Sequence, residues 1–277
     1  MSRARIDARF ARLRAEGRAG FVTYVMAGDP DPETALAILE GLPAAGADLI
    51  EVGFPFSDPL AEGPPIQRAA QRALARGMTL QKSLDLVAAF RRKDSETPVI
   101  LMGYANPLET PGYAAFARAA AEAGVDGLIV VDIPPEEADP LADALDAHDM
   151  SLIRLATPTT DDARLPVVVR RTSGFVYYVS VAGVTGVKEA DAGAVAPNVE
   201  RVRAASGLPV AVGFGVRTVE RAAEVARIAD AVVVGSALVD EVADALEANE
   251  DVTARVLTKV AALAKSVHTA RTPDRGA

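Results

Sequence analysis

The chain has 277 residues, of which 50% are hydrophobic, and a mean hydropathy of +0.17, so it can bury a sizeable core within one globular domain. A net charge of −9 argues against nucleic acid as a main partner, because binding to a phosphate backbone needs a basic surface. The absence of cysteine excludes disulfides, thiolate nucleophiles and Cys-ligated metals, and two histidines leave little scope for imidazole chemistry.

The first segment carries apolar residues at helical spacing. Ile6, Phe10 and Leu13 fall at positions i, i+4 and i+7, which predicts an amphipathic N-terminal helix in spite of the many arginines around them. The sequence contains no apolar run long enough to span a bilayer and no signal-peptide pattern. We therefore expect a cytoplasmic protein with no membrane partner.

Short apolar runs rich in β-branched residues then alternate with longer segments of helical periodicity. The predicted strands are residues 21–28, 48–55, 98–104, 127–133, 150–156, 175–181, 209–214 and 231–235. The predicted helices are residues 32–45, a pair across 65–93, then 111–123, 135–148, 161–171, 197–205, 218–229 and 250–267.

This alternation selects an α/β fold. Several of the strands are continuous apolar runs, which is typical of parallel strands covered on both faces. Eight βα units in roughly 250 residues predict a (β/α)8 TIM barrel. A doubly wound sheet would usually carry a glycine-rich fingerprint after its first strand, and residues 27–30 lack it. We expect one barrel domain over residues 1–268, with an extra N-terminal helix, an additional helix after strand two, and a disordered tail at 269–277.

Glycines gather after the last three predicted strands. They lie in residues 182–186, in Gly213-Phe214-Gly215 and in Gly235-Ser236. Glycine lets backbone N–H groups approach a ligand, and the following helix N-termini favour a bound anion. One such pair could equally be a tight turn. Three clusters at neighbouring positions of a barrel predict a phosphate site.

Two acids follow the second predicted strand. Glu51 lies within or at the end of an apolar run, where an ionised carboxylate is costly, and Glu62 lies in the proline-rich loop beyond it. Two carboxyls in different environments can take opposite acid and base roles. The alternatives are a core ion pair for Glu51 and a solvated loop charge for Glu62. Tyr177 could supply a hydroxyl nearby, or could simply belong to an aromatic layer that fills the barrel.

Two other catalytic styles are not favoured. A Schiff-base aldolase needs a desolvated lysine, and all five lysines fall in predicted helices or beyond a turn. A divalent-metal isomerase with histidine ligands lacks the histidines, so no metal site is expected. Carboxylate acid–base chemistry on a small phosphorylated substrate remains.

Residues 51–67, EVGFPFSDPLAEGPPIQ, closely resemble the signature of the tryptophan synthase alpha chain family, and the resemblance extends along nearly the whole chain. It implies a lyase that cleaves indole-3-glycerol phosphate to indole and glyceraldehyde 3-phosphate by a retro-aldol reaction. No cofactor of its own is implied. Pyridoxal phosphate (PLP) is expected only in a partner beta chain, within an alpha2beta2 heterotetramer.

The resemblance also implies roles for individual residues. Glu51 would shuttle the proton, Glu62 would interact with the indole N–H, and Tyr177 would hydrogen-bond near Glu51. The implied indole pocket consists of Tyr24, Ile66 and Met102. The implied phosphate site consists of Gly186, Gly213, Phe214, Gly215, Gly235 and Ser236, with Thr185 and Asp58 closing two loops. The candidates for contact with the beta chain are Pro55, Asp58, Pro59 and Asn106.

The sequence departs from the family pattern at two positions. Glu62 stands where the family usually has aspartate, which moves the carboxyl outward by roughly one bond length. Val181 stands where many relatives have arginine, which removes a possible loop anchor. Two alternative functions stay open at this point: a catalytically weak barrel that mainly binds and activates the beta chain, and another phosphosugar isomerase or epimerase.

Overall fold

The computed structural model describes residues 2–179, 192–213 and 215–271. Its strands are β1 (Gly20–Met26), β2 (Leu49–Gly53), β3 (Val99–Gly103), β4 (Gly127–Val130), β5 (Ser151–Leu152), β6 (Arg154–Ala156), β7 (Val176–Val179), β8 (Val210–Gly213) and β9 (Ala231–Val234). Its longer helices are α1 (Ser2–Ala15), α2 (Pro32–Gly41), α3 (Pro64–Ala75), α4 (Leu80–Arg91), α6 (Tyr113–Ala123), α7 (Asp139–Asp146), α9 (Ala192–Ser206), α10 (Val219–Ile228), α11 (Ser236–Ala248) and α12 (Val252–Thr269). Shorter helical segments are α5 (Ala105–Glu109), α8 (Leu165–Val169) and the 3₁₀ turn Pro135–Glu137.

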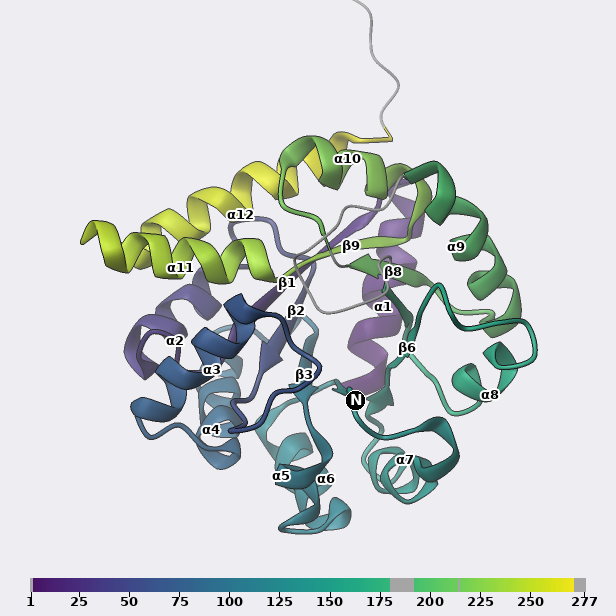
Figure 1. Cartoon of the computed structure of the whole chain (residues 1–277), viewed down its shortest axis with the longest axis horizontal. Coiled ribbons are helices and arrows are strands. Elements are labelled where there is room, and N and C mark those ends of the chain that lie inside the picture. Colours follow the sequence, from purple (N-terminus) through teal and green to yellow (C-terminus); the bar gives the residue numbers. More distant parts are fainter. Residues whose placement is uncertain (1, 180–191, 214, 272–277) are drawn as a thin grey trace, which may run out of the picture.

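The strands form a nearly closed parallel barrel with the helices around it (Figure 1). Their order is β5-β4-β3-β2-β1-β9-β8-β7-β6. β5 and β6 are separated only by Ile153, so they are two parts of the fifth predicted strand: β5 pairs with β4, and β6 pairs with β7. The predicted (β/α)8 fold is confirmed.

The core follows from the apolar strands. β2, β3, β4, β7, β8 and β9 are buried at every position, as expected for parallel strands that face the barrel interior on one side and helices on the other. Tyr177 and Tyr178 show this alternation: Tyr177 faces the barrel interior, and Tyr178 is buried on the side of α9.

The helix α1 is the predicted N-terminal helix, and it packs at the N-terminal ends of the strands. The Phe10 ring lies 5.6 Å from the Phe175 ring, and Arg18, which follows the helix, donates two hydrogen bonds to Asp48. His268 of α12 lies 2.9 Å from the same carboxylate. Burial alone would raise the pKa of Asp48, but the hydrogen bonds from His268, Arg18 and the Phe21 N–H hold that pKa far below its ordinary value.

Two helices of the structure, α5 and α11, were not among the predicted helices. Residues 236–248 form α11, the helix of the eighth βα unit, and α12 packs against α11, α10 and α2 as an additional layer. The short helix α5 follows β3. The last helix ends at Thr269, and Arg271 donates to the carbonyls of Ala226 and Ala229, so residues 269–271 are held on the barrel. The rest of the predicted tail lies outside the described residues.

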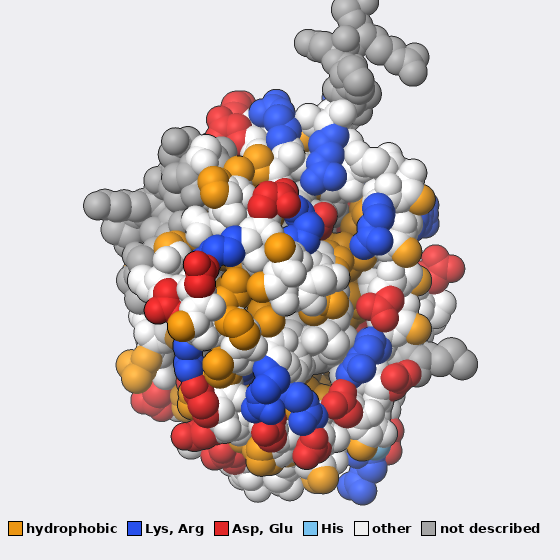
Figure 2. All heavy atoms as spheres, turned by 90° about the vertical axis from the view of Figure 1, so that its right-hand side faces the viewer, with side chains coloured by type: hydrophobic (Ala, Val, Ile, Leu, Met, Phe, Trp, Pro, Cys, Tyr) orange, Lys and Arg blue, Asp and Glu red, His pale blue; other side chains and the backbone are white. Residues whose placement is uncertain are grey.

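The face that carries α8 and α9 mixes acidic and basic side chains around an apolar centre (Figure 2). Ion pairs link its elements, among them Arg201–Asp162 at 2.7 Å and Arg171–Asp143 at 2.7 Å. Within the described part of the chain, no helix combines the length and apolar character needed to cross a membrane.

Candidate active site

A pocket of about 550 Å³, counted out to its mouth, lies at the C-terminal ends of the strands. Tyr24, Glu51, Met102, Tyr177 and Val233 reach it from five different strands. The remaining lining residues come from the loops and helices that follow β2, β8 and β9: Glu62, Ile66, Gly215, Val216, Arg217, Gly235 and Ser236. Active sites of barrel enzymes occupy this end of the fold.

Glu51 is the buried acid of the pocket. It lies in β2 beside Tyr24 of β1, and only 1% of the residue is exposed. Its Oε1 atom is buried without a hydrogen-bond partner among the described residues. Burial first, and then the charge of Glu62, raise the pKa of Glu51 to about 8. A buried polar atom left without a partner is costly and calls for an explanation, which a substrate group would provide.

Glu62 reaches the same pocket from the loop between β2 and α3, and it is 7% exposed. Two side chains fix the backbone around it. The Tyr104 hydroxyl accepts a hydrogen bond from the Ala61 N–H at 2.9 Å, and Gln67 Nε2 donates to the Glu62 carbonyl at 2.9 Å. The Tyr104 ring also packs on Phe56, with ring centroids 5.1 Å apart. The loop is therefore held from α3 and from the residue that follows β3.

Burial raises the pKa of Glu62 to about 7, below the value of about 8 at Glu51. The order matters because Glu62 ionises first, while Glu51 still carries its proton and exerts no negative charge. The Glu62 carboxylate then opposes ionisation of Glu51. Near neutral pH the pocket therefore combines a protonated acid with a carboxylate that is at least partly ionised, the pairing needed for acid–base chemistry.

Two tyrosines complete this end of the pocket. Burial, together with the two carboxyls, raises the pKa of Tyr24 and of Tyr177 well above the ordinary value, so both hydroxyls keep their protons. A Cβ atom at Gly213 would lie 2.1 Å from the Tyr177 hydroxyl, and one at Gly53 would lie 2.1 Å from the Tyr24 hydroxyl. The glycines in the neighbouring strands thus make room for the tyrosine side chains.

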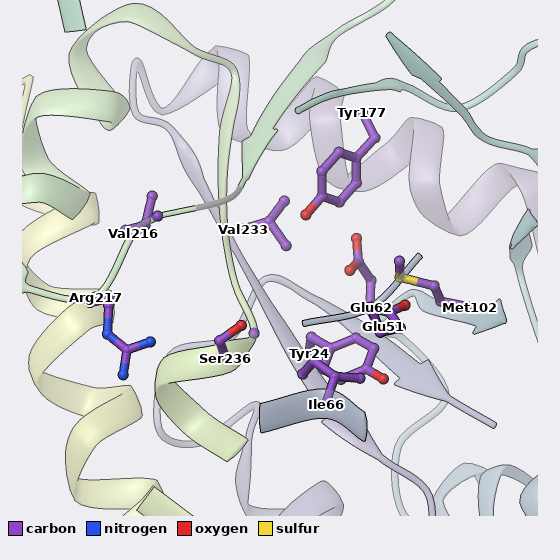
Figure 3. A pocket seen from close by; sticks show the side chains of 12 residues that line it. Tyr24, Glu51, Glu62, Ile66, Met102, Tyr177, Val216, Arg217, Val233 and Ser236 are labelled. Atoms are coloured by element: carbon purple, nitrogen blue, oxygen red, sulfur yellow. The ribbon is translucent and has the colours of Figure 1, made fainter. Parts of the chain in front are cut away.

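The other end of the pocket is built for an anion. Ser236 is the first residue of α11, and no side chain caps this helix at Gly235. The first N–H groups of a helix lack intrahelical partners and carry partial positive charge. Gly215, with φ of +80°, brings the loop after β8 to the same pocket. Figure 3 shows Ser236 and Arg217 on one side, with Tyr177, Glu51 and Glu62 gathered on the other.

Most of the substrate-binding residues predicted from the sequence meet in this pocket. The predicted residues that line it are Tyr24, Glu51, Glu62, Ile66, Met102, Tyr177, Gly215, Gly235 and Ser236. Gly213 lies against Tyr177. Thr185, Gly186 and Phe214 lie outside the described residues, as does Val181.

The four candidates for partner contact do not line the pocket. Asp58 and Asn106 are exposed, Pro59 is partly exposed, and Pro55 is buried at the base of the loop. Leu60, between Pro59 and Glu62, is 86% exposed, which is unusual for a large apolar side chain.

Sequence reasoning missed three lining residues, Val216, Arg217 and Val233. Val233 is hidden in an apolar run. Arg217 had a recognisable signal, because it directly follows the glycine loop after β8 and precedes Thr218, the N-cap of α10. Over the described ranges, no group of three or more histidine, aspartate or glutamate residues is arranged to hold a metal ion.

Comparisons with known proteins agree with this geometry. The family model described as "Tryptophan synthase alpha chain" matches residues 10–268. A tryptophan synthase alpha chain from Phenylobacterium zucineum is 80% identical over 98% of each chain, and one from Caulobacter vibrioides is 72% identical over the same shares. The crystal structure of tryptophan synthase subunit alpha from Legionella pneumophila superposes with a TM-score of 0.89 at 42% identity, covering 95% of this chain and 98% of that one. A Mycobacterium tuberculosis tryptophan synthase structure gives a TM-score of 0.86 at 37% identity, covering 95% and 98%.

Proposed function

Because the chain belongs to the tryptophan synthase alpha chain family, we propose that Glu51, Glu62 and Tyr177 are its catalytic residues. The chain is a carbon–carbon lyase of tryptophan biosynthesis, which cleaves indole-3-glycerol phosphate to indole and glyceraldehyde 3-phosphate. It uses no cofactor of its own and works with a PLP-dependent beta chain. The observation that carries the residue assignment is the pair of buried carboxyls with unequal pKa values in one pocket, opposite an uncapped helix N-terminus.

The pocket orients the substrate by its two ends. The phosphate lies at the N-terminus of α11, near Gly215 and Ser236, where helix N–H groups favour a dianion. The indole ring lies at the apolar end, among Tyr24, Ile66 and Met102. This orientation brings the bond between indole C3 and glycerol C3′ to Glu51.

Glu51 carries the proton in both directions. In its protonated form it donates to indole C3, which leaves a positive charge on the ring nitrogen. The resulting Glu51 carboxylate then removes the proton of the C3′ hydroxyl as the C3–C3′ bond breaks. The electrons of that bond return to the ring, an aldehyde forms at C3′, and Glu51 ends protonated again. The raised pKa of about 8 supplies the protonated form at neutral pH.

Glu62 stabilises the positive charge of the intermediate by accepting a hydrogen bond from the indole N–H. The Tyr177 hydroxyl donates a hydrogen bond near Glu51. A carboxylate in a water-poor pocket interacts strongly with a developing charge. Glutamate in place of aspartate at position 62 changes the reach of this group and keeps its chemistry. The Tyr104 and Gln67 hydrogen bonds fix the loop backbone from which that side chain extends.

We also propose that the loop from Pro55 to Glu62 faces the beta chain, with Asp58, Pro59 and Asn106 as contacts and Pro55 as support beneath them. The exposed Leu60 side chain supports this surface. In the same proposal, Asp58 and Thr185 close loops over the substrate. Replacing Asp58 by asparagine would weaken beta-chain binding in a titration, and unchanged affinity would remove it from the interface. The reaction is placed in the cytoplasm, which cell fractionation would test.

Indole release from indole-3-glycerol phosphate tests the catalytic assignment. Glu51→Gln should fold normally and lose turnover by orders of magnitude, whereas Glu62→Asp should retain activity or gain it. Glu96→Gln, at an exposed position away from the pocket, is the matched control. Near-native turnover of Glu51→Gln would overturn the assignment. A wild-type chain that activates the beta chain without releasing indole would instead indicate the catalytically weak barrel.

A further inference from the structure

Arg217 lines the anion-binding end of the pocket and has no role in the chemistry described so far. It lies on the loop after β8, between the pocket residue Val216 and Thr218, the N-cap of α10. In Figure 3 its side chain lies on the same side of the pocket as Ser236, away from the two carboxyls. The other groups at this end are glycine backbone atoms and one serine hydroxyl. Arg217 is therefore the lining residue there that carries a full positive charge.

The guanidinium is held in place by an acid outside the pocket lining. Arg217 Nη2 lies 2.5 Å from Asp240 Oδ2, and Asp240 belongs to α11, the helix whose N-terminus faces the pocket. Arg68 of α3 approaches the other oxygen of this carboxylate at 3.7 Å. Among the residues that the structure describes, Asp240 is the one hydrogen-bond acceptor of Arg217, whose side chain is 41% exposed.

This arrangement fits recognition of a dianion. A guanidinium presents five N–H donors in a planar fork, so one nitrogen can stay on a carboxylate while another binds a phosphate oxygen. Asp240 fixes the side chain at the rim and reduces the conformational freedom lost on binding. The charge of Asp240 would oppose a phosphate placed near the start of α11, and Arg217 offsets it.

We propose that Arg217 binds the substrate phosphate directly and makes the pocket specific for phosphorylated substrates. The inference rests on the proposed function, because it takes the anion at α11 to be the phosphate of indole-3-glycerol phosphate. The interaction exists in the bound substrate and in the transition state alike. It therefore lowers KM and leaves kcat unchanged.

The experiment compares three variants of the full chain. Arg217→Gln removes the charge and leaves a shorter, neutral side chain that can still form hydrogen bonds. Arg227→Gln removes the same charge from an exposed position on α10, and is the matched control. The double variant Arg217→Gln with Asp240→Asn separates direct contact from neutralisation of Asp240. Binding of glycerol 3-phosphate is measured by calorimetry, cleavage of indole-3-glycerol phosphate by indole release, and folding by thermal unfolding.

Arg217→Gln should weaken glycerol 3-phosphate binding and raise KM by roughly tenfold each, the lower end for a hydrogen bond to a charged group. Its kcat and its affinity for indole alone should stay unchanged, and the effect should shrink as salt is added. The double variant should remain weak, and Arg227→Gln should match the wild type. Wild-type affinity in Arg217→Gln, or affinity restored in the double variant, would overturn direct binding. Neither result would contradict the proposed function. That function is refuted only if the wild-type chain releases no indole from indole-3-glycerol phosphate.

Discussion

Replacing Glu51 by glutamine should stabilise the protein, and the gain should grow with pH. The pKa of Glu51 lies at about 8 in the folded chain against an ordinary value of 4.5. Between these values the folded state binds a proton that the unfolded chain has released, so the free energy of unfolding falls as pH rises. Glutamine has nearly the same shape and cannot ionise, so the variant avoids this loss.

The magnitude follows from the pKa difference. Each unit corresponds to about 1.4 kcal/mol, so the advantage of Glu51→Gln should reach about 3 kcal/mol at neutral pH. Above the folded pKa it should level off at about 5 kcal/mol. Below the unfolded pKa the wild type is protonated in both states, and the two proteins should differ only by a constant.

Urea unfolding from about pH 5 to about pH 9 measures this difference. The chain has no tryptophan, so the helical circular dichroism signal is the appropriate probe. Glu96→Gln, at an exposed position, is the matched control. If the difference in the free energy of unfolding between Glu51→Gln and wild type stays constant across this range, burial does not raise the pKa of Glu51. The mechanism that uses the raised pKa would then be refuted.

The remaining predictions concern catalysis and the loop that carries Glu62. The kcat/KM profile should rise as Glu62 ionises near pH 7 and fall as Glu51 ionises near pH 8, and Glu62→Gln should shift the falling limb to lower pH, because the Glu62 charge helps to raise the pKa of Glu51; a falling limb that stays in place would refute that coupling. Tyr104→Phe keeps the ring and removes the acceptor of the Ala61 N–H, so kcat should drop several-fold while the free energy of unfolding falls by only about 1 kcal/mol. Unchanged kcat in the indole assay would mean that the loop is positioned without this hydrogen bond. Gly213→Ala places a Cβ 2.1 Å from the Tyr177 hydroxyl, so indole release should fall by at least roughly tenfold in a folded variant. Native turnover would show that the Tyr177 hydroxyl is not needed for the reaction.

The fold could be predicted because parallel barrel strands are apolar on both faces. This pattern can be recognised in each strand's own sequence, without knowing which strands pair with it. The break between β5 and β6 at Ile153 was not predictable in the same way, since it depends on pairing with β4 on one side and β7 on the other. The helix α11 was missed although Leu238, Val242 and Ala245 have helical spacing and are buried. Its start at the glycine loop after β9 resembles a turn.

Glu51 could be predicted because a glutamate in an apolar run is conspicuous, whereas Glu62 is a loop acid whose role was expected from the family resemblance. Arg217 was missed although it follows the glycine loop after β8, because its position in the pocket also depends on the direction of that loop and on an acid in another helix. Gly213 was predicted from backbone freedom as a phosphate ligand. Its lack of a side chain is also required by the hydroxyl of Tyr177, a contact between strands that local sequence does not reveal.

The carboxylate of Asp48 joins α1 through Arg9 and α12 through His268, at the end of the barrel opposite the pocket. Both termini of the described chain are therefore fastened far from the pocket mouth. We expect that affinity tags, fluorescent labels or a fused second enzyme can be added at either end without obstructing substrate entry or the loop proposed to contact the beta chain. The same closeness of α1 and α12 makes the barrel a natural subject for circular permutation, with new ends opened in a surface turn.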